Sequence, residues 1–151
     1  MPDEAADKKK IIVIDDDRAF LAEFTDMLKS AGYEVTALTD CATILDIAPR
    51  LKPDLIVLDL KLKSMSGFEG ASALRYFPST SCIPVIAMSA FYTLREHDFL
   101  ANFCGIKRFL KKPFSSSEAF GQIEDVLKER RAQLNVKGDI FEDHEEDTGS
   151  G

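Results

Sequence analysis

Five polar side chains in this sequence stand at, or directly beside, the ends of short apolar runs. They are Asp15, Asp16, Asp59, Ser89 and Lys112. Three carboxylates brought close together repel one another, so either their pKa values rise or a cation binds between them. No Cys or His accompanies them, so the ligand set would be oxygen alone. Such a set favours a hard ion such as Mg²⁺.

The same residues are suited to phosphoryl transfer. A carboxylate can attack phosphorus to form an acyl phosphate, and Asp59 is the predicted nucleophile because Asp15 and Asp16 are adjacent and can share the metal. The Lys112 ammonium and the Ser89 hydroxyl would neutralise phosphoryl oxygens. Any one of these residues alone is equally well explained as a turn or helix-cap residue. Their joint occurrence is what predicts a site.

Strands and helices that could position these residues alternate along the chain. Continuous apolar runs indicate strands buried on both faces, as in a parallel sheet. Strands are predicted at 11–14, 34–38, 55–58, 83–88 and 106–110, and helices at 20–30, 40–51, 68–77, 92–103 and 115–134. This alternation predicts a doubly wound parallel α/β sheet. The strand order 2-1-3-4-5 suits five strands better than the six-strand dinucleotide order.

In such a sheet, ligands bind beyond the carboxyl ends of the strands, so the five polar groups would converge on one cleft. The turn after the first strand reads Asp15-Asp16-Asp17-Arg18, with no glycine-rich phosphate loop. This turn argues against dinucleotide binding.

Composition sets the class of protein. The net charge is −7, but six acidic residues lie in 139–151, which has no Lys or Arg, so the remainder is nearly neutral. We therefore expect no nucleic-acid partner and no anionic membrane surface as a partner. No apolar run approaches a membrane span and no signal peptide is visible. Three widely spaced cysteines suggest free thiols in a cytoplasmic protein. The predicted organisation is a disordered leader at 1–7, one domain at 8–134 and an acidic disordered tail at 135–151.

Four stretches together resemble the response-regulator receiver family. They are Ile11-Ile12-Val13-Ile14-Asp15-Asp16-Asp17, Pro53-Asp54-Leu55-Ile56-Val57-Leu58-Asp59, Pro84-Val85-Ile86-Ala87-Met88-Ser89-Ala90 and Phe109-Leu110-Lys111-Lys112-Pro113-Phe114. The resemblance implies a flavodoxin-like five-stranded sheet of order 2-1-3-4-5 with five helices. It also implies Mg²⁺ binding by Asp15, Asp16, Asp59 and the backbone carbonyl of Lys61. A cis peptide between Lys112 and Pro113 is implied as well.

The resemblance also implies how a signal would leave the site. Ser89 would move toward the phosphoryl group and Phe109, on the fifth strand, would rotate inward. The face formed by the helix predicted at 92–103, the strand at 106–110 and the helix at 115–134 would then bind a downstream protein target, or support a phosphorylation-dependent dimer. Lys61 and the bulky Phe91, two residues after Ser89, are expected to tune the lifetime of the phosphoryl group.

The predicted function is that of a two-component response regulator receiver. It would accept a phosphoryl group on Asp59 from a histidine kinase or histidine phosphotransfer protein, and signal by protein–protein binding. Its only chemistry would be self-phosphorylation and self-dephosphorylation, so it is not classed as an enzyme. One alternative is a receiver module excised from a larger kinase or regulator. Another is a phosphohydrolase of the haloacid-dehalogenase type, with Asp15 and Asp17 as nucleophile and acid, although Ala19 departs from that pattern.

Overall fold

The computed structural model describes residues 8–62, 66–90 and 104–149, and the side chains of these residues up to 136. Its strands are β1 (Lys10–Ile14), β2 (Glu34–Leu38), β3 (Leu55–Asp59), β4 (Val85–Ser89) and β5 (Ile106–Lys111). Its helices are α1 (Arg18–Ser30), α2 (Ile44–Leu51), α3 (Gly67–Tyr76) and α5 (Ser116–Gly149). All strand pairs are parallel and the order is β2-β1-β3-β4-β5, so the predicted parallel sheet and its order are confirmed.

Four helices lie within the described residues, where five were expected for the whole chain. The helix predicted at 92–103 and the leader at 1–7 lie outside the residues that the structure describes. In that described part, no helix is long and apolar enough to cross a membrane.

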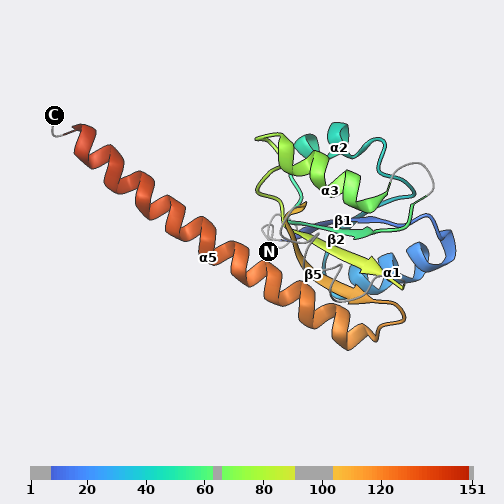
Figure 1. Cartoon of the computed structure of the whole chain (residues 1–151). Coiled ribbons are helices and arrows are strands. Elements are labelled where there is room, and N and C mark those ends of the chain that lie inside the picture. Colours follow the sequence, from blue (N-terminus) through green and yellow to red (C-terminus); the bar gives the residue numbers. More distant parts are fainter. Residues whose placement is uncertain (1–7, 63–65, 91–103, 150–151) are drawn as a thin grey trace.

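The sheet separates two apolar cores, which explains why its strands read as unbroken apolar runs. Ile12 and Ile14 pack on one face with residues of α2 and α3. Ile11 and Val13 pack on the other face with residues of α1 and α5. Because neighbouring side chains of a strand point to opposite faces, both sets must be apolar when helices cover both sides. Figure 1 shows the sheet between these helices.

The predicted start of the second helix at residue 40 is wrong, since α2 begins at Ile44. The Asp40 side chain accepts a hydrogen bond of 2.8 Å from the backbone N–H of Ala42. This local contact stabilises a turn in which Cys41 is buried, so the helix begins only after the turn.

The last helix differs most from its prediction. The sequence predicts an end near residue 134 and then a disordered tail, whereas α5 continues to Gly149, so the predicted helix end is wrong. Its first half is anchored by the buried Ala119, Ile123 and Val126. No proline follows residue 113, so nothing in the backbone forces the helix to stop there. Figure 1 shows its second half projecting away from the sheet.

Candidate functional site

A cleft of about 410 Å³ lies at the carboxyl edge of the sheet, where the sequence predicts the site. Its lining residues come from the end of β3 and from the loops after β1, β3, β4 and β5, and they are Asp15, Asp16, Asp17, Asp59, Lys61, Leu62, Ala90 and Lys112. Four of the five polar residues predicted to form the site therefore line one cavity. The fifth, Ser89, is buried at the last position of β4, directly before Ala90.

The three predicted carboxylates meet in this cleft. Oxygen atoms of Asp15, Asp16 and Asp59 all lie within 4.8 Å of one another. Asp15 is fully buried, and Asp59 keeps only 7% of its surface exposed. Buried carboxylates at this separation need compensating positive charge, so the fold holds a strongly anionic centre that water screens poorly.

Lys112 supplies part of that compensation. Its ammonium donates to Asp15 Oδ2 at 2.6 Å and to Asp59 Oδ2 at 3.3 Å. It also lies 4.2 Å from the centre of the Phe20 ring, whose face attracts a cation. Burial opposes the charged ammonium, but the hydrogen bond and charge of Asp15, together with Asp59, outweigh it and raise the pKa of Lys112. The ammonium is therefore fixed in its charged form.

One ammonium does not neutralise three carboxylates. Burial raises the pKa of Asp15, and hydrogen bonds from Lys112 and from the Asp17 N–H only partly offset this effect. Three carboxylates and one ammonium carry a formal charge of about −2 when all are ionised. An oxygen-only donor set with this excess charge fits a hard divalent cation such as Mg²⁺, and Asp15, Asp16 and Asp59 would be its side-chain ligands.

Backbone hydrogen bonds orient the site. The Lys61 N–H donates to Asp59 Oδ1 at 2.9 Å, which leaves Asp59 Oδ2 facing Lys112. The Lys112 N–H donates to the carbonyl oxygen of Ser89 at 2.9 Å, which holds the ends of β4 and β5 together. The Lys112–Pro113 peptide is cis, as the resemblance implies. Asp17 lines the cleft but acts as the N-cap of α1, since its side chain accepts from the Phe20 N–H.

The register of the sheet places Phe109 beside Ala87, and Lys111 beside Ser89. Alternate residues of a strand share one face, so Phe109 lies diagonally across from Ser89 on the face covered by α2 and α3. Phe91, predicted to tune the site, lies outside the described residues.

Two residues near the site had no functional role in the sequence analysis. Phe20 is the first residue of the helix predicted at 20–30, and its ring supports the Lys112 ammonium. Gly67 directly precedes the helix predicted at 68–77, and a Cβ atom there would overlap the carbonyl oxygen of Asp59 and the Cα of Leu60. For Gly67, the only signal in the sequence was a glycine directly before a helical segment.

Gly67→Ala is expected to destabilise the fold by about 1–3 kcal/mol, because the new methyl group displaces the backbone of Asp59 and Leu60. The matched control is Gly121→Ala in α5, where an added Cβ atom would have no neighbour within 4 Å. That change should stabilise by about 0.5–1 kcal/mol. Urea unfolding measures the free energy of unfolding of both variants, which should change in opposite directions from wild type. Equal changes would contradict the close approach at Gly67.

Comparisons with known proteins agree with this geometry. Residues 11–124 match the family described as the response regulator receiver domain. The DNA-binding dual master transcriptional regulator RpaA of Synechocystis is 33% identical over 120 residues, which cover 79% of this chain and 49% of RpaA. The polar-differentiation response regulator DivK of Brucella anthropi is 29% identical over 119 residues, which cover 79% of this chain and 96% of DivK. The chain thus spans about half the length of RpaA.

Among solved structures, the chemotaxis protein CheY4 of Vibrio cholerae superposes with a TM-score of 0.74 at 24% identity, covering 79% of this chain and 98% of CheY4. This likeness supports the fold alone. The family match, in contrast, takes in most of the chain and includes every strand end that forms the cleft. The chain belongs to the response regulator receiver domain family of two-component signalling.

Proposed function

We propose that this receiver accepts a phosphoryl group on Asp59 and passes the resulting change to a protein partner. The observation that carries the proposal is the meeting of three carboxylates with Lys112 in one cleft, where Asp59 is held by the Lys61 N–H and still keeps some exposure. Asp15 is a poorer nucleophile, because it is fully buried, whereas Asp59 keeps 7% of its surface exposed.

In the proposed reaction, an Asp59 carboxylate oxygen attacks the phosphorus of the donor. The bond from phosphorus to the donor's nitrogen or oxygen breaks, and the donor leaves with the electron pair. Lys112 then turns from Asp59 toward an equatorial phosphoryl oxygen, and the Ser89 hydroxyl approaches another. Bound Mg²⁺, held by Asp15, Asp16, Asp59 and the carbonyl oxygen of Lys61, would supply charge neutralisation for the transferring group.

The outgoing signal is proposed to run from Ser89 to Phe109. Their diagonal placement on neighbouring strands supports this step, since a shift of Ser89 toward the cleft changes the space next to the Phe109 ring. We place the partner-binding surface on β5, α5 and the helix predicted at 92–103, and a phosphorylation-dependent dimer would use the same face. The helix predicted at 92–103, which would bring the number of helices in the fold to five, is part of this proposal.

The proposed donor is a histidine kinase or a histidine phosphotransfer protein in the cytoplasm, and no nucleic acid or membrane takes part. The proposed chemistry is limited to self-phosphorylation and self-dephosphorylation. The half-length match to RpaA fits the alternative of a module excised from a larger regulator, and the match to 96% of DivK fits a receiver that acts by itself. The family match favours a receiver over a phosphohydrolase of the haloacid-dehalogenase type.

The test is incubation of the protein with acetyl phosphate, a small phosphoryl donor, followed by intact-mass measurement. We expect one phosphoryl group to be added with Mg²⁺ present and almost none in EDTA. The added group should be released by alkali or hydroxylamine, as an acyl phosphate is. Modification that is independent of Mg²⁺, or stable to hydroxylamine, would refute the proposal.

The lifetime of the phosphoryl group is proposed to depend on Lys61 and Phe91. A bulky Phe91 would restrict the approach of hydrolytic water. Phe91→Ala is therefore expected to shorten the half-life roughly tenfold, which corresponds to lowering the activation free energy of hydrolysis by about 1.4 kcal/mol. Lys61→Ala should act in the same direction. Decay of the phosphorylated protein, followed by intact mass after removal of the donor, gives both rates. An unchanged half-life in Phe91→Ala would contradict this role.

A further inference from the structure

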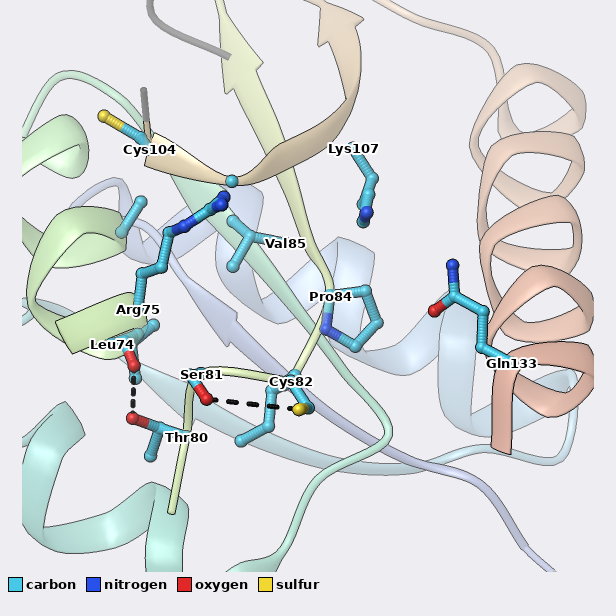
Figure 2. Close-up of a pocket in the computed structure, with 13 residues that line it drawn as sticks. Leu74, Arg75, Thr80, Ser81, Cys82, Pro84, Val85, Cys104, Lys107 and Gln133 are labelled. Atoms are coloured by element: carbon cyan, nitrogen blue, oxygen red, sulfur yellow. Dashed lines mark hydrogen bonds between the residues drawn. The ribbon is translucent and has the colours of Figure 1, made fainter. Parts of the chain in front are cut away.

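A second cavity, of about 310 Å³, lies at the opposite edge of the sheet from the carboxylates. It is enclosed by the end of α3, the loop before β4, the start of β5 and Gln133 of α5, as Figure 2 shows. Its floor is buried and largely apolar, and consists of Ala71, Leu74, Ile83, Pro84, Val85 and Cys104. Its rim is polar and exposed, and includes Arg75, Ser81, Lys107 and Gln133.

The charge of this cavity is opposite to that of the chain. The protein has a net charge of −7, yet the residues lining the cavity include Arg75 and Lys107 and no Asp or Glu. Within the described part of the chain, no carboxylate lies within ion-pair distance of either cation. Two cations without partners around a shared cavity attract an anion.

The walls of the cavity are held in place before any ligand binds. The buried Thr80 hydroxyl donates to the Leu74 carbonyl oxygen and fixes the loop that follows α3. The Arg75 side chain lies against Gly105, where a Cβ atom would overlap the guanidinium group, and Gly105 has a φ of +71°. Figure 2 shows Arg75 extending from α3 toward the start of β5, with Lys107 of β5 and Gln133 of α5 on the other side of the cavity.

We propose that this cavity binds a small organic anion, with its charged head between Arg75 and Lys107 and its apolar body on the buried floor. The volume is at the lower end of the range of about 300–1,000 Å³ that is usual for small-molecule sites. Such a ligand matches both parts of the lining. An inorganic anion would leave the apolar floor unused, and a neutral apolar molecule would leave the two cations unused.

Cys82 offers a direct readout, because it lines the cavity and is exposed. The other two cysteines, Cys41 and Cys104, are buried, and burial together with nearby carboxylates raises the pKa of Cys41 to about 12. Iodoacetamide should therefore modify Cys82 first in the native protein. A bound ligand should slow this modification, which peptide mass analysis can follow at Cys82 alone.

The experiment measures the concentration of 1-naphthalenesulfonate that halves the alkylation rate of Cys82 in the full chain. Inorganic sulfate and the neutral naphthalene-1-sulfonamide test the head group and the apolar body separately, and we expect both to protect much less. In the double variant Arg75→Gln/Lys107→Gln, the half-protection concentration should rise roughly tenfold or more. The matched control, Lys128→Gln, removes an exposed cation of α5 that does not line the cavity. It should leave the half-protection concentration unchanged.

The ligand dependence of the rate is the readout, since removing nearby cations also changes the intrinsic reactivity of a thiol. Absence of protection by the sulfonate would overturn the proposal. Equal protection by the sulfonamide would also overturn it, and so would a rise of the half-protection concentration in Lys128→Gln as large as in the double variant. In either case the two cations would have no specific role. If a short polyglutamate peptide protects better than the sulfonate, the occupant is an acidic protein segment and not a small organic anion.

Discussion

Asp59→Asn is expected to abolish acyl phosphate formation from acetyl phosphate. An amide cannot supply the carboxylate oxygen that attacks phosphorus, and the neighbouring Asp15 is fully buried. The loss should exceed about 10³-fold in initial rate, which corresponds to more than about 4 kcal/mol of barrier. Intact-mass measurement in saturating Mg²⁺ gives the phosphorylated fraction with time.

The control for this change is Asp26→Asn, which makes the same chemical substitution at an exposed position of α1. It should be phosphorylated at the wild-type rate. If the Asp59→Asn protein were modified as fast as the control, the nucleophile would be another residue. The added mass should then be mapped to a peptide, with Asp16 the first candidate because it is only half-buried in the same cleft.

Lys112→Gln is expected to have two large effects. It removes the cation that contacts both Asp15 and Asp59, so phosphorylation should slow by about 10²–10³-fold. It also leaves the fully buried Asp15 beside two other carboxylates without a counterion. In EDTA at neutral pH this should lower the free energy of unfolding by about 2–4 kcal/mol. Urea unfolding and acetyl phosphate kinetics measure the two effects separately.

The control is Lys111→Gln, at the exposed last position of β5, one residue before Lys112. Its stability should stay within about 0.5 kcal/mol of wild type. Added Mg²⁺ should restore part of the stability lost in Lys112→Gln, because the carboxylates regain a cation. Equal stability of the two glutamine variants in EDTA would show that the Lys112 contacts contribute nothing to folding.

The stability difference between wild type and Lys112→Gln should also depend on pH in a defined direction. Contacts with Asp15 and Asp59 raise the pKa of Lys112 in the folded state. Its contribution is therefore complete below the ordinary lysine pKa of about 10.4, and is lost as the pH rises through the higher folded-state value. In EDTA, the difference should be constant from neutral pH to about pH 9 and shrink at more alkaline pH. A difference that widened with alkalinity would contradict this assignment.

The sequence alone determined the sheet and the residues at its edge. Runs such as Ile11–Ile14 and Leu55–Leu58 indicate strands covered on both faces, because they are short, rich in β-branched residues and apolar at every position. Polar residues directly after such runs must lie at the carboxyl edge of a parallel sheet. Asp15 and Asp59 were therefore predictable as neighbours without any knowledge of distances.

Local contacts that compete with periodicity were not predictable. The start of α2 depends on one hydrogen bond from the Ala42 N–H to Asp40, which apolar spacing does not report. The length of α5 was underestimated because the apolar pattern ends where the helix leaves the core. A helix can continue without a buried face when nothing in its sequence breaks it, so loss of apolar periodicity did not mark its end.

Only the tertiary structure decided which groups touch. Lys112 and Asp15 are 97 positions apart, and their 2.6 Å contact depends on strand order, register and the path of the loop after β5. The support of that ammonium by Phe20, the close approach of Gly67 to Asp59, and the cavity that joins Arg75 to Lys107 have the same origin. Sequence patterns report which face of an element is buried, whereas contacts between elements are set by how those faces pack together.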